Sequence, residues 1–179
     1  MIQLARALDA QTGPETASDV FAMAGYADLY GAPPDAMVDE RIPAARFAAV
    51  GAALAAARAA AVASYAGWRT ADYVIAHRIP RVAKALLRRL PRRFAARLLL
   101  RAIERNAWTF AGSGVCRTAH RPGLTIAIER NPLTTPGCAW HRGVFERMFG
   151  RLIADVAVAS REDRGASGAP TSRFDITFA

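Results

Sequence analysis

The sequence predicts an α+β fold in which N-terminal helices pack on a small antiparallel β-sheet. Alanine dominates much of the first half of the chain, and alanine favours helix. Pro43, Pro80 and Pro91 stand where three long helical segments begin, a position that proline tolerates. After residue 106, short segments rich in β-branched and aromatic residues are separated by glycine and proline, as strands and turns are. Helices followed by strands are typical of α+β folds.

Length and composition predict a single compact domain. The chain has 179 residues, of which 53% are hydrophobic, enough for one sizeable core. Within this domain we distinguish a helical part, residues 1–106, from an α+β part, residues 107–179.

The alanine-rich stretch 44–66 lies in a predicted long helix, and its smooth surface fits either a central core helix or the seam of a homodimer. We also predict a turn at 31–34 followed by a brief helical piece. The predicted long helix spans residues 43–76. The other predicted helices are Met1–Asp9, Thr16–Met23, Arg81–Leu90, Arg92–Asn106 and Cys138–Ile153. The predicted strands are Trp108–Phe110, Leu124–Ile128, Ala154–Ser160 and Arg173–Phe178, with residues 161–172 expected to be polar and turn-rich.

The net charge of +9 comes almost entirely from arginine, since Lys84 is the only lysine. Arginine presents a planar fork that fits carboxylates and phosphates. In the segment 92–106 four arginines recur every fourth residue, and such like charges repel unless an external anion is present. This stripe indicates either a docking surface for an acidic partner or an ordinary solvated face. Its members are Arg93, Arg97, Arg101 and Arg105, and we expect Phe94, Leu98, Leu99 and Ile103 to face the core.

Several partner and cofactor classes are not indicated. The aromatic residues do not interleave with the arginine stripe and no nucleic-acid-binding signature is present, so we expect no nucleic-acid partner. Cys116 and Cys138 cannot form a metal cluster alone, and we expect both to be reduced. The first residues lack the apolar core of a signal peptide, and no window reaches about 18 uncharged apolar residues. We therefore expect a cytoplasmic protein, with contact to a membrane surface left open.

The residues supply no recognisable equipment for hydride or electron transfer. Gly112-Ser113-Gly114 lacks the third glycine and the following helix of a dinucleotide site. The two cysteines do not support an iron–sulfur cluster, whereas a flavin site has no short signature and stays open. No serine nucleophile is indicated, and we assign no catalytic residue. Cys138 and His141 are spaced for a thiolate–imidazolium pair, an alternative that we also leave open.

Three segments carry a family resemblance: TADYVIAHRIP (70–80), AWTFAGSG (107–114) and CAWHRGVFERMF (138–149). With them, the chain resembles the bacteriochlorophyll 4-vinyl reductase family of photosynthetic bacteria from about Ala10 onward. The resemblance implies that roughly Trp108 to Phe178 form a 4-vinyl reductase domain, a small-molecule-binding α+β module. It also implies reduction of the 4-vinyl group (8-vinyl in current nomenclature) of a pigment.

The sequence departs from the family at the end of this domain. The family has a glutamate and two cysteines around a Gly-Ala-Pro turn, spaced like ligands of a structural metal. Here the turn is present at 168–170, but Arg164 and Ser172 stand where cysteines are expected, and Cys138 matches an upstream one. Because a single thiolate with an arginine and a serine cannot hold zinc tetrahedrally, we predict no metal there.

Together these points favour an accessory protein of bacteriochlorophyll biosynthesis with no intrinsic cofactor. It would bind a tetrapyrrole intermediate, a magnesium porphyrin or a divinyl protochlorophyllide-like pigment, and deliver it to pathway enzymes. The arginine stripe would dock on an acidic surface of magnesium chelatase or of the methyltransferase that follows it. The alternatives are the 4-vinyl reductase activity itself and a scaffolding module that binds only protein. Whether the chain is an enzyme stays open.

A tetrapyrrole requires apolar walls, a cation for its carboxylate edge and a ligand for its central metal. We assign the carboxylate to Arg78 and Arg81. His77 would be the axial or hydrogen-bonding ligand; alternatively it caps the last carbonyls of the long helix. The predicted walls are Trp68, Tyr73, Trp108 and Phe110. We expect His141 to be a core histidine and His120 to lie exposed in a polar loop.

Overall fold

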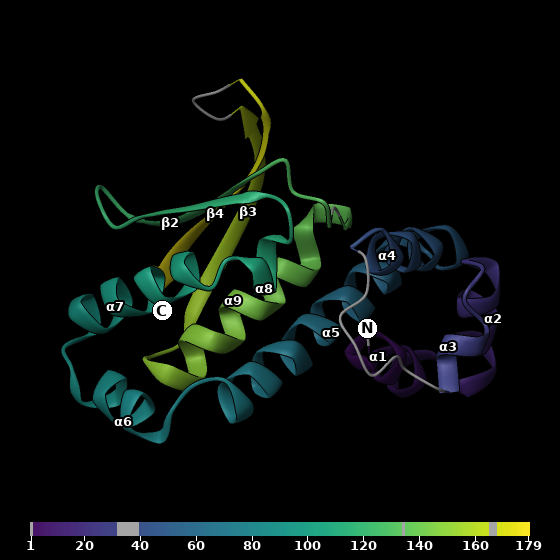
Figure 1. Ribbon diagram of the computed structural model, residues 1–179, viewed down its shortest axis with the longest axis horizontal. Coiled ribbons are helices and arrows are strands. Elements are labelled where there is room, and N and C mark those ends of the chain that lie inside the picture. Colours follow the sequence, from purple (N-terminus) through teal and green to yellow (C-terminus); the bar gives the residue numbers. More distant parts are fainter. Residues whose placement is uncertain (1, 32–39, 134, 165–167) are drawn as a thin grey trace.

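The computed structural model describes residues 2–31, 40–133, 135–164 and 168–179. Its longer helices are α1 (Ile2–Thr12), α2 (Pro14–Met23), α4 (Arg41–Ala53), α5 (Ala56–His77), α6 (Arg81–Arg89), α7 (Arg92–Arg105) and α9 (Ala139–Leu152). Its short helices are α3 (Asp28–Gly31), α8 (Trp108–Ala111) and the 3₁₀ turn η1 (Pro136–Cys138). The strands are β1 (Val115–Ala119), β2 (Leu124–Glu129), β3 (Val156–Arg164) and β4 (Pro170–Phe178). The predicted α+β class is confirmed. Figure 1 shows α1–α4 gathered at one end, with α5 running from them towards α6 alongside α9, which lies between α5 and the sheet.

The four strands form one antiparallel sheet in the order β1-β2-β4-β3. Its inner face packs on α7 and α9 and is apolar. Its outer face carries ion pairs between β3 and β4: Arg173 Nε lies 3.5 Å from Asp163 Oδ2, and Arg161 Nη2 lies 3.7 Å from Asp175 Oδ2. This alternation of apolar and charged residues fixes which face of each strand is buried. The buried inner residues are Ile126, Ile128, Val158, Phe174 and Ile176.

Helices α5 and α9 approach each other closely through two glycines. A Cβ at Gly67 would lie 2.2 Å from the carbonyl oxygen of Trp140, and a Cβ at Gly143 would lie 2.3 Å from that of Ser64. Neither position has room for a side chain. The small residues of α5 therefore pack against α9 of the same chain. This confirms the prediction of a central core helix for the part of residues 44–66 that lies in α5.

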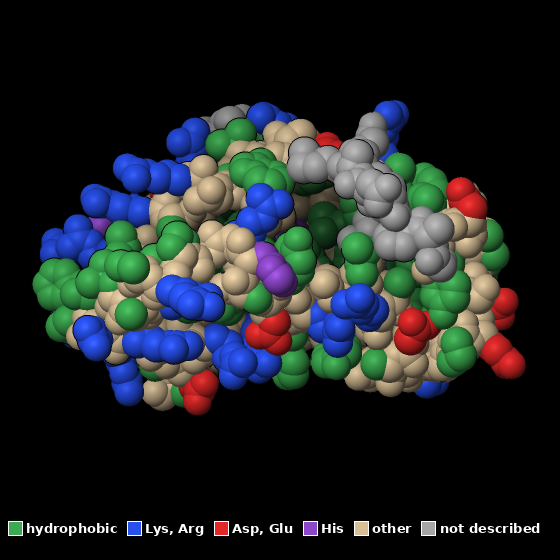
Figure 2. All heavy atoms as spheres, turned by 60° about the horizontal axis from the view of Figure 1, so that its bottom comes forward, with side chains coloured by type: hydrophobic (Ala, Val, Ile, Leu, Met, Phe, Trp, Pro, Cys, Tyr) green, Lys and Arg blue, Asp and Glu red, His purple; other side chains and the backbone are tan. Residues whose placement is uncertain are grey.

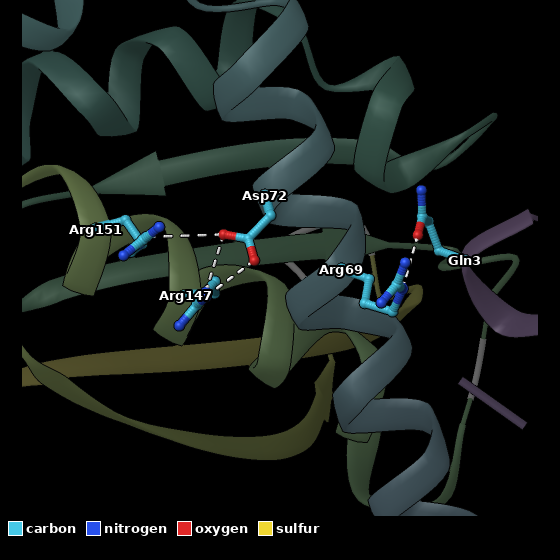
Figure 3. Close-up of polar contacts among 5 residues, drawn as sticks. All are labelled: Gln3, Arg69, Asp72, Arg147 and Arg151. Carbon is cyan, nitrogen blue, oxygen red and sulfur yellow. Dashed lines mark hydrogen bonds and ion pairs between the residues drawn. The ribbon is translucent and has the colours of Figure 1, made fainter. Parts of the chain in front are cut away.

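Polar contacts on α5 connect it to two neighbouring helices (Figure 3). Asp72 accepts two hydrogen bonds from Arg147 of α9, from Nε at 3.0 Å and Nη2 at 2.9 Å. Arg151 Nε lies 3.8 Å from the same carboxylate. Towards α1, Arg69 Nε donates to Gln3 Oε1 at 3.1 Å. The two-point contact of Arg147 fixes orientation as well as distance between α5 and α9.

The single long helix predicted over 43–76 is wrong, because the chain breaks between α4 and α5. Leu54 and Ala55 are extended, with ψ of 152° and 143°. The break lets α4 pack on α2 while α5 packs on α1 and α9. Alanine-rich sequence carries no local signal for such a break. The predicted turn at 31–34 and the helical piece after it lie outside the described residues, apart from Gly31.

The strand predicted at Trp108–Phe110 is also wrong. These residues form α8, in which the amides of Phe110 and Ala111 both donate to the carbonyl of Ala107. Gly112 ends the turn at a φ of 52°. Aromatic residues favour strands only where they pack on a sheet, and here Phe110 packs on α9 instead.

Two further differences concern the sheet and α7. Strand β1 was not predicted, and β3 and β4 extend into the segment 161–172 that was expected to be turn-rich. Cross-strand ion pairs explain why this polar sequence forms strands. On α7, Leu99 and Ile103 are buried as predicted, but Phe94 and Leu98 are 60% and 41% exposed, so their assignment to the core is wrong.

The glycine contact predicts opposite effects for two glycine-to-alanine substitutions. Gly143→Ala should lower the free energy of unfolding by about 3 kcal/mol, because the methyl group overlaps a backbone carbonyl and forces α5 and α9 apart. Gly51→Ala, on α4 with no neighbouring atom within 4 Å, should raise it by about 0.5–1 kcal/mol through helix propensity. Urea unfolding of the two variants measures both changes. Equal effects would contradict the close approach.

Candidate functional site

Four of the predicted ligand-binding residues meet where α5 ends and α8 begins. The rings of Tyr73 and His77, one helical turn apart, have centroids 4.6 Å apart. Arg78, the next residue, places its guanidinium carbon 5.8 Å from the ring centroid of Trp108. Tyr73 and Trp108 are 47% and 52% exposed, and His77 and Arg78 are exposed as well. We call these four residues the α5–α8 site.

This site offers three kinds of contact at one exposed place. Trp108 presents an aromatic face, and the guanidinium of Arg78 forms no ion pair with a described carboxylate. The imidazole of His77 makes no hydrogen bond to the described residues. Lys84 Nζ, rather than His77, donates to a carbonyl at this end of α5, that of Ile75 at 2.9 Å. The helix-capping alternative for His77 is therefore wrong, and its ring nitrogens are available to a ligand.

Beneath the site, Phe110 and His141 hold α8 on α9. Phe110 is buried with its ring 6.0 Å from that of Phe145, and its carbonyl oxygen lies 2.9 Å from His141 Nε2. His141 is fully buried, so the predicted core histidine is confirmed. Burial lowers the pKa of His141 to about 4, against the opposing effect of the Phe110 carbonyl. His141 is therefore neutral and donates from Nε2, while Nδ1 has no partner among the described residues.

Other predicted ligand-binding residues lie elsewhere. Trp68 precedes His77 by nine residues, which places it half a turn away around α5. Its ring instead contacts Tyr65, at a centroid distance of 6.5 Å. Arg81 is exposed at the start of α6, three residues after Arg78 in the sequence. Phe110 lies under the site rather than on its surface.

Sequence reasoning did not find two contacts of the N-terminal helices. The Oε atoms of Glu40, which precedes α4, accept hydrogen bonds from the amide and hydroxyl of Ser113, at 2.8 Å and 2.6 Å. This contact joins the N-terminal helices to the loop after α8. Arg46 is buried with its guanidinium carbon 4.4 Å from the ring centroid of Phe21. No local signal marks either contact, because the partners lie far apart in sequence.

Three residues at the position of the family's metal site come together, Cys138, Glu162 and Ser172. Cys138 Sγ donates to Glu162 Oε1 at 3.5 Å, and Ser172 Oγ donates to the same oxygen at 3.4 Å. Burial raises the pKa of the Cys138 thiol, which keeps it protonated. Over the described ranges, no group of three or more His, Cys, Asp or Glu side chains has a metal-binding arrangement. Both cysteines are free and buried.

None of the helices in the described part of the chain is long and apolar enough to cross a membrane. His120 is exposed in the loop between β1 and β2, as predicted.

Comparison with known proteins identifies similar chains but no matching family model. The sequence is 43% identical over 117 residues to the Bacteriochlorophyll synthase 23 kDa chain of Cereibacter sphaeroides, covering 62% of this chain and 57% of that protein. It is 46% identical over 110 residues to the protein of the same name from Rhodobacter capsulatus, covering 58% and 52%. The chain thus spans a little over half the length of the curated relatives it matches.

Two solved structures share the fold at low sequence identity. One is described as "Probing the function of heme distortion in the H-NOX family", with a TM-score of 0.62 and 11% identity over 99% of this chain and 92% of that one. The other is described as "Modulating Heme Redox Potential Through Protein-Induced Porphyrin Distortion", with a TM-score of 0.55 and 9% identity over 99% and 97%. At this identity the likeness shows the fold alone.

The buried histidine predicts a loss of stability in acid. The pKa of His141 is about 4 when folded and near 6.5 when unfolded, so the unfolded state binds the proton more tightly. The free energy of unfolding should fall by about 2–3 kcal/mol from pH 7 to pH 4.5 through this residue. In His141→Gln, whose amide can still donate to Phe110, the decrease should be smaller by that amount. Urea unfolding at the two pH values measures it.

His77→Gln is the matched control, because it makes the same substitution at an exposed histidine and should retain the full decrease. An equally steep decrease in His141→Gln would contradict the neutral buried imidazole.

Proposed function

We propose that this protein binds a tetrapyrrole intermediate of bacteriochlorophyll biosynthesis and delivers it to enzymes of the pathway. The ligand class is a magnesium porphyrin or a divinyl protochlorophyllide-like pigment, bound as cargo. We propose in addition that residues 107–179 are of the 4-vinyl reductase domain type.

The similarity to two proteins named Bacteriochlorophyll synthase 23 kDa chain carries the placement in this pathway. The segments 70–80, 107–114 and 138–149, which resemble the 4-vinyl reductase family, support the same pathway. They contain all four residues of the α5–α8 site. The pathway proposal and the site proposal therefore rest on overlapping parts of the chain.

The fold supports the choice of a tetrapyrrole. Both solved structures of similar fold are described in terms of heme or porphyrin, a flat macrocycle of the same chemical class. The helical part and the sheet part of this chain are arranged as in those structures over nearly their whole lengths. We infer that this arrangement accommodates a planar pigment, and the α5–α8 site supplies the polar contacts.

Each residue of the site has a role matched to a part of the ligand. Trp108 stacks on the macrocycle, as half-exposed aromatic rings do with flat ligands. Arg78 exchanges its contact with Trp108 for a two-point hydrogen bond to a carboxylate edge. His77 binds the central magnesium or donates to the ring periphery. Because these side chains are already exposed, the pigment leaves without opening of the core, which suits a protein that delivers its ligand.

A spectral titration tests the proposal. Adding the purified protein to divinyl protochlorophyllide should shift the Soret band, and pigment and protein should elute together. Arg78→Gln should raise Kd about tenfold, since a charge-assisted hydrogen bond is lost. Trp108→Ala should weaken binding further through lost stacking.

The matched control is Trp68→Ala, which removes a similarly exposed tryptophan from another side of α5 and should leave Kd unchanged. An unchanged Soret band with the unaltered protein would overturn the proposal. Turnover of the divinyl pigment by the protein and a reductant alone would replace the carrier role with the vinyl reductase activity.

A further inference from the structure

Helices α6 and α7 expose a row of large apolar side chains that the core does not use. Val82 and Leu86 on α6 are 80% and 46% exposed, and Phe94 and Leu98 on α7 are 60% and 41% exposed. Each pair is spaced by four residues, so its members lie along one side of their helix. The opposite sides of the helices are buried, through Leu87 on α6 and residues such as Leu99 on α7. We call the four exposed residues the α6–α7 apolar row.

The apolar row is surrounded by positive charge. Residues 81–105 contain nine basic residues and one acidic residue, Glu104, whose carboxylate accepts a hydrogen bond from Thr118. In the part of the chain that the structure describes, no ion pair includes an arginine of α6 or α7. Figure 2 shows hydrophobic side chains among Lys and Arg at the end of the molecule that α6 and α7 form.

Charge is also separated along the whole molecule. Residues 2–31 and 40 contain five acidic residues and one basic residue, whereas residues 41–179 contain 23 basic and eight acidic residues. The N-terminal helices lie at the end opposite α6 and α7 (Figure 1). A negatively charged surface would therefore attract the α6–α7 end and repel the other, which orients the protein before contact.

We propose that α6 and α7 bind an anionic lipid surface, with the apolar row inserted at the boundary between headgroups and acyl chains. On the exposed side of α7 the apolar row lies beside arginines, and helices that combine exposed Phe, Leu or Val with arginine bind membranes in this way. The arginine stems extend along the apolar boundary while their guanidinium groups reach the lipid phosphates. This inference stands on the exposed residues alone and does not depend on the pigment proposal.

The exposure of the row favours lipid over an acidic protein as the partner. An acidic protein surface would neutralise the charge of the arginine stripe. It would leave Phe94 and Val82, the most exposed residues of the row, without an apolar partner. An anionic bilayer offers phosphates to the arginines and acyl chains to the apolar side chains. The four side chains of the row are exposed on two helices that lie together at one end of the molecule (Figure 1).

Vesicle sedimentation tests the proposal. The full chain should sediment with vesicles of phosphatidylcholine and phosphatidylglycerol at about 70:30, and not with phosphatidylcholine alone. Binding should weaken as salt is raised, since screening shortens the reach of the arginine charges. Absence of binding to the mixed vesicles at low salt would overturn the proposal.

A first pair of variants tests insertion of the apolar row. Val82→Ala with Phe94→Ala should lower the vesicle partition coefficient about tenfold or more, while alanine preserves the helices. The matched control is Ile2→Ala with Met23→Ala, which removes exposed apolar side chains from the N-terminal helices and should leave binding unchanged. Thermal unfolding monitors the fold of both.

A second pair tests the charge. Arg97→Gln with Arg101→Gln should lower the partition coefficient about thirtyfold. Arg6→Gln with Arg142→Gln makes the same charge change at exposed positions outside α6 and α7 and should have little effect. If the arginine pair abolishes binding but the Val82 and Phe94 pair does not, charge alone holds the protein on the vesicles, and the insertion of the apolar row is overturned.

Discussion

The close approach of α5 and α9 is the constraint on which the rest of the structure depends. It requires glycine at 67 and 143, because each faces a backbone carbonyl of the opposite helix. Helix α9 in turn contacts β3 and carries His141 and Phe145, on which Phe110 rests. Since α8 is a single turn, the position of Trp108 follows from that support. A change of spacing between two buried helices therefore moves an exposed ligand-binding candidate.

The sequence predicted those elements whose two faces differ in polarity. In Leu124–Ile128 and Arg173–Phe178, apolar residues of the inner face alternate with small or charged residues of the outer face, so their strands could be identified locally. The break before α5 and the helix at Trp108 could not. Alanine favours helix, so an alanine-rich stretch predicts one continuous helix, whereas the extended backbone at Leu54 and Ala55 lets α4 and α5 pack on different neighbours. The aromatic residues 108–110 fit strand or helix until the partner of Phe110 is known.

The candidate site was predicted in part for a similar reason. His77, Arg78 and Tyr73 are close in sequence, and the structure adds Trp108 to them through one cation–π contact. Trp68 was grouped with them by residue type, but helical phase places it on another side of α5. The error at Phe94 and Leu98 has a related cause. Apolar residues on both flanks of α7 looked equivalent, whereas the core accepts only the flank of Leu99 and Ile103.

The two proposed surfaces are neighbours in the chain and in space. Only three residues separate the end of α5 from the start of α6, and Lys84 of α6 donates to the Ile75 carbonyl near the end of α5. A protein lying on lipid through α6 and α7 thus holds His77 and Arg78 close to the bilayer. An apolar pigment with carboxylate edges concentrates at that same boundary, because its ring leaves water while its charges stay hydrated. Membrane contact and pigment exchange then reinforce each other, since binding at the surface shortens the distance over which the pigment must pass through water.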